Sequence, residues 1–465
     1  MRPLLLFGAT IGALLTLPCL VTAEPMSIEH CLREAVRHHP SLRMAHAAIR
    51  SREAEADSTR GHLLPVLKTR FNLTRWDSDQ DLRVDVSSFA ALLKDFEPLL
   101  SAETKTAIAT LSADGLSLPV RDDLTWQTGV TVGQPLTRLY PIAAGYSAQK
   151  DLAAAARLDA TSARRLVEAD TARAWYGLAA ATRLRSTAEA ALRQIEAVET
   201  QVAALLDAGM VEPNALLKVR VQKADIERRL FQADKAASLT TAFLNAQMGR
   251  ELTLPIEPEG DGRIATETDE GPGHAGEAVL ARPELQAARL RVAAARRGRH
   301  VALGEALPQL TAFFTYENNQ GFGQLVKENQ FYGGLALEWN VWDWGASWYK
   351  VRAARARAAE AEAALALGED RVRLDLASRR LDLEEAHKAR ALSQRQLEQA
   401  HENLRVEQLR FDVRETTVTD LLTATTLSLQ AANEDVVAEM KVQEARLALR
   451  LAQGDDLLKE TGEER

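Results

Sequence analysis

Apolar residues recur at two different periods along this chain, and each period occurs twice. In the second half an apolar residue stands at every seventh position, with one interruption at Arg390: Leu376, Leu383, Leu397, Leu404 and Phe411. A seven-residue apolar repeat forms the seam of a coiled coil. Residues 348–410 contain no proline, so the pattern predicts one long helix over 346–411. At about 1.5 Å per residue, that helix would be roughly 95 Å long.

The chain is expected to turn back after each of two long helices. The helix over 346–411 is followed by a β-branched cluster and then by a return helix over 419–451. An earlier long helix over 142–207 is followed by Gly209, which suits a helix C-terminus, and by Pro213, which suits the first turn of the next helix. That return helix is expected over 214–248.

The two helical hairpins belong to a tandem duplication. In the later part of each copy, residues 205 positions apart are of the same or a similar type, as in Gly129 and Gly334. Positions 243 apart correspond in the earlier part of each copy, as in Pro40 and Pro283. Two constant offsets held over many positions indicate a repeat. Because the offsets differ by 38 residues, the first copy carries an insertion, which we place at 77–123.

Four segments alternate between apolar and polar residues and are expected to be strands. They lie at about 65–76, 124–136, 308–318 and 330–342. Each is about as long as a tilted transmembrane strand. Aromatic residues gather at the strand ends or just beyond, as they do at membrane interfaces: Trp76, Trp126, Trp339, Trp342, Trp344, Trp348, Tyr332 and Tyr349. Alternation alone fits a half-buried sheet of a soluble protein equally well.

Four strands are too few to close a barrel in a membrane, where about eight is the minimum. Open sheet edges are not tolerated in lipid. If these strands span a membrane, several chains must therefore share one barrel, and three chains would supply 12 strands. The return helix of one copy and the first helix of the next could stack end to end beside a long helix, which predicts a helical tube below the barrel.

The remaining segments complete the expected layout. The first repeat (24–250) begins with a helix over 27–61, in which the residues before Pro40 could form a separate short helix or turn. The second repeat (277–454) begins with a helix over 277–305. Between the repeats, residues 251–276 are rich in proline, glycine and acid and form a linker.

Two segments lie outside the repeated pattern. The insertion is expected to contain a short amphipathic helix built on Phe89, Leu92, Leu93 and Phe96 and broken at Pro98. Residues 455–465 form a polar C-terminal tail.

The composition of the chain argues against nucleic-acid binding. The net charge of −8 gives nucleic-acid binding no electrostatic support.

Residues 1–23 have the charged start, apolar run and small-residue site of a cleaved signal peptide. Pro18 before Cys19 disfavours lipoprotein processing, and Cys31 is then alone, so neither a disulfide framework nor a metal site is expected. No later segment reaches the roughly 18 apolar residues of a membrane helix.

The sequence resembles the TolC family of outer-membrane efflux proteins over essentially all of its mature length. The resemblance depends on the order and duplication of short motifs: His39-Pro40-Ser41-Leu42, Arg282-Pro283-Glu284-Leu285, Leu64-Pro65-Val66-Leu67, Leu307-Pro308-Gln309-Leu310, Gln134-Pro135-Leu136 and Trp342-Asp343-Trp344-Gly345. The family implies a mainly α fold with a small β-barrel portion. It further implies a homotrimer with a 12-stranded barrel in the outer membrane and a 12-helix periplasmic tunnel, which exports cargo with a periplasmic adaptor and an inner-membrane pump.

The resemblance also assigns two kinds of site. The helical turns correspond to the tips that the adaptor engages: Gly209, Met210 and Val211 in the first turn, and Val413, Arg414, Glu415 and Thr416 in the second. Arg414 stands where the family usually has glycine. Asp420 matches an acid that rings the closed tunnel end, and Thr423 stands where some members have a second acid. Asp420 is equally suited to favour a helix N-terminus through the helix dipole.

Two other classes of function are weighed against the channel. For an enzyme, the sequence lacks the nucleophile, zinc-protease, phosphate-loop and dinucleotide motifs. No catalytic residue, cofactor or metal is therefore expected. A soluble periplasmic coiled-coil scaffold or adaptor would explain the helices and the signal peptide. It would not explain paired strands of membrane length with aromatic ends. The cargo and the class of pump are not specified by any motif.

Overall fold

The computed structural model describes residues 23–85, 101–114, 116–260, 282–323 and 326–458, together with residues 88, 91, 92, 96 and 262. The predicted signal peptide and Cys19 lie outside the described residues, apart from Ala23. Most of the helix expected around Phe89 and Pro98 also lies outside them, as does most of the linker.

The element order repeats, as expected from the two sequence offsets. The first copy runs α2 (Pro40–Gly61), β2 (Val66–Arg75), β5 (Leu124–Pro135), α5 (Leu139–Asp207) and α6 (Pro213–Gln247). The second runs α8 (Pro283–Glu305), β7 (Gln309–Gln320), β8 (Asn329–Glu338), α9 (Ala346–Asp412) and α10 (Val418–Gln453). The mainly α fold with two long helical hairpins and a small β portion is thus confirmed.

The described residues fall into two compact units. One contains the described residues of Met1–Ala47, Arg157–Gln286 and Ala366–Arg465, and the other contains those of Ala48–Ala156 and Ala287–Leu365. We call the first the helical unit and the second the sheet unit, and each is described by itself.

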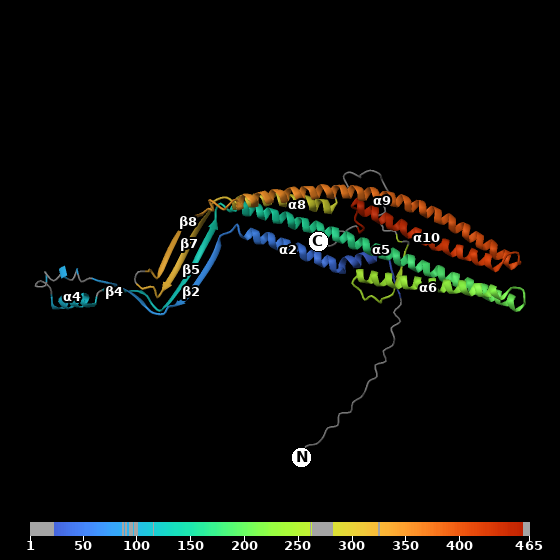
Figure 1. Ribbon diagram of the computed structural model, residues 1–465, viewed down its shortest axis with the longest axis horizontal. Helices are drawn as coiled ribbons and strands as arrows, with labels where there is room; N and C mark the ends of the chain where they lie inside the picture. The colour runs from blue at the N-terminus through green and yellow to red at the C-terminus, as the bar shows by residue number, and fades with distance from the viewer. Residues whose placement is uncertain are drawn as a thin grey trace, which may run out of the picture. The chain divides into compact units, whose positions relative to one another are not determined.

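The sheet unit contains a four-stranded antiparallel sheet in the order β2-β5-β7-β8, with the strands side by side in Figure 1. The register separates polar from apolar side chains, so the predicted alternation gives the sheet two different faces. The polar face carries Lys68, Arg70, Asn72, Gln127, Thr131, Thr315, Glu317, Asn319 and Gln330. Side-chain hydrogen bonds cross this face, from Gln127 to Asn319 over 2.9 Å and between Thr131 and Thr315 over 3.0 Å.

The opposite face of the sheet is apolar and exposed. Its large side chains are Leu67, Phe71, Leu73, Leu124, Trp126, Val132, Phe314, Phe331, Leu335 and Leu337. Their exposed fractions range from 39% for Trp126 to 69% for Phe331. In the part of the chain that the structure describes, no helix combines the length and the apolar character needed to cross a membrane.

The insertion between β2 and β5 forms structure of its own. Strands β3 (Gln80–Val84) and β4 (Leu116–Arg121) pair as an antiparallel ribbon, and α4 (Ala102–Asp114) lies between them in sequence. The sequence analysis did not predict α4 or the ribbon. The Arg121 guanidinium lies 3.7 Å from the ring centre of Trp76, where β2 leads into the insertion.

The region expected to be helical over 27–61 is divided at Pro40 into two helices, α1 and α2, which is one of the two outcomes that the sequence left open. α1 (Ile28–His38) is capped by Ser27, and α2 begins at Pro40 after His39 in an extended conformation. Proline has no backbone N–H and disfavours helical geometry in the residue before it. Pro40 therefore starts a new helix instead of continuing the old one.

The helical unit has a core that contains both Met26 and Leu457. Strands β1 (Glu24–Met26) and β6 (Ile256–Pro258) pair in parallel, and the Trp175 indole N–H donates to the Met26 carbonyl oxygen over 3.0 Å. Leu457 packs into the same core with only 1% exposed. Leu457, within the tail expected over 455–465, is therefore an anchored core residue.

Candidate functional site

The two helical turns of the hairpins have the same backbone geometry. In the first, the Gly209 and Met210 N–H groups donate to the carbonyls of Leu206 and Leu205, both over 2.8 Å. In the second, the Arg414 and Glu415 N–H groups donate to Phe411 over 3.0 Å and Arg410 over 2.7 Å. This pair of bonds is the Schellman ending of a helix, which requires a left-handed residue at its turn.

Arg414 is that left-handed residue, at φ 67°, and Gly209 is its counterpart, at φ 73°. A left-handed conformation is unfavourable for residues with a Cβ by about 1–2 kcal/mol. The replacement of glycine noted in the sequence thus leaves the turn geometry intact and adds backbone strain.

The return helices begin differently after these matched turns. α6 begins at Pro213, and its N-cap residue Glu212 makes no side-chain capping bond. α10 begins with a capping box, in which the Thr417 hydroxyl accepts from the Asp420 N–H over 3.2 Å. The Asp420 carboxylate in turn accepts from the Thr417 N–H over 3.3 Å and from its hydroxyl over 2.6 Å. The second turn is therefore fixed by side chains and the first by proline.

The environment of Asp420 favours its charged form. Hydrogen bonds from the Thr417 hydroxyl and N–H, with smaller effects of the Thr416 hydroxyl and the Arg410 charge, lower the pKa of the Asp420 carboxyl below its ordinary value. Because Asp420 is exposed, its negative charge remains accessible to ions at neutral pH. Asp420 therefore caps the start of α10, and the hydrogen bonds of the cap favour its charged carboxylate.

Asp420 and Thr423 line one polar groove of about 540 Å³ beside the second turn. The groove also contains Arg414, Glu415 and Thr416 of the predicted docking tip. The five residues that the sequence analysis assigned to two roles are therefore neighbours. Val413, the remaining residue of that tip, is 66% exposed.

The two turns are joined through their helices. A buried cluster contains residues of all four helices, among them Val202 of α5, Val219 of α6, Phe411 of α9 and Leu421 of α10, and Val211 of the first turn packs against it. Two polar contacts lie nearby. The Gln201 amide donates to Asp412 over 3.1 Å, and the Lys218 ammonium donates to Thr419 over 3.0 Å.

Met210 is a large exposed side chain of the first turn, with 54% of its surface accessible. Gly209 has nothing within 4 Å of the position that a Cβ would occupy. The surface of this turn at Gly209 is therefore open.

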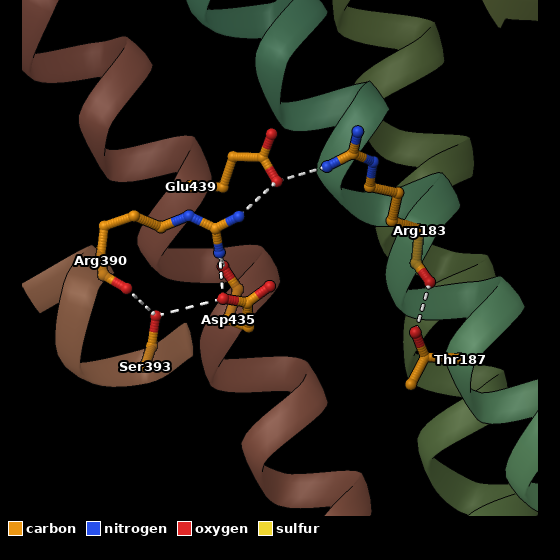
Figure 2. Close-up of polar contacts among 6 residues, drawn as sticks. All are labelled: Arg183, Thr187, Arg390, Ser393, Asp435 and Glu439. Carbon is orange, nitrogen blue, oxygen red and sulfur yellow. Dashed lines mark hydrogen bonds and ion pairs between the residues drawn. The ribbon is translucent and has the colours of Figure 1, made fainter. Parts of the chain in front are cut away.

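A further charged network lies in the helical unit, away from the turns (Figure 2). Arg390 interrupts the apolar seam of α9, and its guanidinium pairs with the Asp435 carboxylate and, over 3.3 Å, with Glu439, both on α10. The Ser393 hydroxyl donates to Asp435 over 3.3 Å. Glu439 also pairs with Arg183 of α5. The interruption at Arg390 was visible in the sequence, but its partners were not.

Among the described residues, no group of three or more histidine, cysteine, aspartate or glutamate side chains is arranged to hold a metal ion. Cys31 is buried, and burial raises the pKa of its thiol to about 12. It is therefore a packed, unreactive thiol at neutral pH.

Known structures share this fold over nearly the whole chain. The outer-membrane channel OprN has a TM-score of 0.76 and 18% identity, with 92% of this chain and 90% of that chain covered. VceC, an outer membrane protein of Vibrio cholerae, has a TM-score of 0.74 and 18% identity, with 93% and 97% covered. The open state of the MtrE outer membrane channel of Neisseria gonorrhoeae has a TM-score of 0.73 and 16% identity, with 92% and 88% covered. The chain therefore has the fold of an outer-membrane channel subunit.

The sequence of the second repeat matches one family model. Residues 275–455 match the model of the family described as outer membrane efflux protein. The predicted resemblance to TolC-like efflux proteins is confirmed, and this is a family of outer-membrane channels rather than an enzyme class. No curated protein sequence matches the chain significantly.

Proposed function

We propose that the protein is the outer-membrane exit duct of a tripartite efflux or type I secretion system. The observation that carries the proposal is the two-faced sheet, in which an exposed apolar face is backed by a hydrogen-bonded polar face. A sheet with one face in lipid and the other around an aqueous passage has this pattern. The duct is passive, and the partner pump supplies the energy.

A homotrimer is the assembly that this chain supports. Strands β2 and β8 are the two edges of the sheet, and open edges are not tolerated in lipid. Exposed apolar residues also follow one side of α6, namely Leu217, Val221, Phe231 and Leu239, and one side of α9, namely Leu367, Leu374 and Leu381. Packing against neighbouring copies would cover these stripes and pair the strand edges.

The proposed location and partners follow from this role. Residues 1–23 are a cleaved signal peptide that directs export, and the strands lie in the outer membrane. The helical turns face the periplasm. Gly209, Met210, Val211, Val413, Arg414, Glu415 and Thr416 form the surface that a periplasmic adaptor engages.

The oligomeric mass of the full-length protein, extracted from outer membranes in mild detergent, tests the assembly. We expect a trimer in native mass spectrometry and heat-modifiable migration on gels. A soluble periplasmic scaffold, the other candidate, would fractionate without detergent. A monomer found in the soluble fraction would reject the duct.

Asp420 is the proposed selectivity residue of the closed end, with Thr423 beside it. Three copies of Asp420 around one axis would attract cations and repel anions. We expect Asp420→Asn to reduce the preference for cations in planar bilayers, because the charge is lost. Glu402→Gln on α9 is the control, since Glu402 is exposed and paired with Arg405. Unchanged ion preference in Asp420→Asn would remove this residue from the gate.

A further inference from the structure

A second cavity lies within the sheet unit, where the strands meet the helices. It has a volume of about 610 Å³ and is bounded by residues of α2, α5, α8 and the polar face of the sheet. Its apolar wall contains Val66, Pro141, Ile142, Val301 and Phe313. Pockets for small organic ligands commonly enclose about 300–1,000 Å³ and have mainly apolar walls. The cavity is therefore large enough for a drug-sized molecule.

The walls of this cavity are held by specific contacts. A Cβ at Gly145 would lie 3.6 Å from Val301 and 3.8 Å from Thr59, so three helices approach one another there. The Thr137 hydroxyl donates to the Pro308 carbonyl and accepts from the Leu310 N–H, both over 2.9 Å. These bonds fix the connection between β5 and α5 against the start of β7. The cavity is thus a built feature of the fold.

Cationic groups line this apolar cavity without an ionic partner. Lys68 of β2 and Arg138, just before α5, both line it, and neither forms an ion pair with another described residue. Glu305 is the acid of the lining, and it lies 3.8 Å from the Lys350 ammonium. The cavity therefore combines an apolar wall with unpaired positive charge.

We propose that this cavity binds an amphiphilic anion, a molecule with an apolar ring or chain and a carboxylate, sulfonate or phosphate group. The apolar body would cover Val301 and Phe313, and the anionic group would pair with Lys68 and Arg138. Charge-assisted hydrogen bonds to such groups are among the stronger polar contacts. A cationic amphiphile would meet repulsion at the same position.

The place of this site in transport rests on the proposed function. In the duct, the polar face of the sheet lines the passage, so an anion in the cavity is cargo on its way out or a blocker of the exit. Binding itself rests only on the cavity and its charges. The two claims can therefore fail separately.

Isothermal titration calorimetry of the full-length protein in non-ionic detergent tests the site, with 1-naphthalenesulfonate as the probe. We expect saturable binding, and a loss of about tenfold or more in affinity when Lys68→Gln and Arg138→Gln are combined. Arg70→Gln is the matched control, because Arg70 lies on the same sheet face outside the cavity lining. It should change affinity much less than the double variant, because Arg70 does not line the cavity.

Three results would overturn the proposal: no binding to the unmodified protein, an equal loss in Arg70→Gln, or equal affinity for 1-naphthylmethylammonium. Arg138→Lys keeps the charge and should keep most of the affinity. It provides a second measurement if the double variant fails to fold. Calorimetry does not depend on conduction. Binding by a protein that forms no channel would reject the duct and leave the site in place.

Discussion

Arg414 occupies a left-handed position that glycine fills in the matching turn of the first repeat. We expect Arg414→Gly to raise the free energy of unfolding by roughly 0.5–1 kcal/mol, because relief of strain exceeds the added flexibility of the unfolded chain. Gly209→Ala should lower it by about 1 kcal/mol, through conformation alone, since a Cβ there meets no neighbour. Thermal unfolding in detergent measures both. A loss of stability in Arg414→Gly would contradict this account of the turn.

Glu168 is a buried acid of the helical unit, with 1% of its surface exposed and a 2.9 Å hydrogen bond from Arg164. Burial raises the pKa of its carboxyl, against the opposing effect of Arg164. The folded protein thus holds this proton more tightly than the unfolded chain, and stability falls as pH rises from the ordinary glutamate pKa through the raised one. We expect Glu168→Gln to be more stable than the unmodified protein at pH 8 and to lose this advantage near pH 4.

Glu189→Gln is the control for that experiment. Glu189 lies on the same helix and accepts from Arg185 over 3.0 Å at the same spacing, but it is exposed. Its replacement should change stability by less than about 0.5 kcal/mol. A stability difference in Glu168→Gln that is the same at both pH values would show that the proton on Glu168 is not responsible.

At the scale of elements, the ion pair of Arg390 with Asp435 replaces an apolar contact between α9 and α10. The two side chains are only 21% and 15% exposed. We expect Arg390→Met to lower the free energy of unfolding by roughly 2–3 kcal/mol, because Asp435 loses its main partner in a partly buried site. The double variant Arg390→Met with Asp435→Leu should recover most of this loss, since apolar residues can replace such a pair.

Arg373→Ala on the same helix provides the comparison. Arg373 pairs with the exposed Asp370 over 2.7 Å, and an exposed pair contributes about 0–1 kcal/mol. Unfolding of single and double variants, arranged as a double-mutant cycle, measures the coupling. A coupling near zero between Arg390 and Asp435 would mean that the pair does not hold these helices in register.

The long hairpins could be predicted from the sequence because their signals are local. The seven-residue seam of α9 and the glycine and proline around the first turn lie within short stretches of chain. The alternation that gives the sheet its two faces is also local. The insertion carried no such regular pattern, so α4 and the ribbon of β3 and β4 were missed.

The interactions that depend on pairing between distant segments could not be predicted. Arg390 was visible as a break in the seam, but its partner Asp435 is set by the register of α9 against α10. The burial of Leu457 depends on the fold bringing the C-terminal segment to the core around Met26. The residues of the second turn were identified through the family resemblance, and their common groove emerged only in three dimensions.

At the scale of the whole molecule, the fold of outer-membrane channels and the family match of the second repeat agree with the two-faced sheet. Each copy of the chain would supply four strands and two helical hairpins to a shared duct. The polar face of the sheet, including the cavity beside Lys68, would then line the exit. The paired turns, with Asp420 beside them, would form the periplasmic end.

Single-channel conductance of the purified full-length trimer in a planar bilayer tests this account most directly. We expect discrete currents that are small and prefer cations, because in the proposed duct the Asp420 carboxylates would surround a closed helical end. Opening at the turns by a bound adaptor should increase the conductance. A correctly folded protein that inserts and carries no current under either condition would contradict the account, as would a protein that cannot be incorporated into the bilayer.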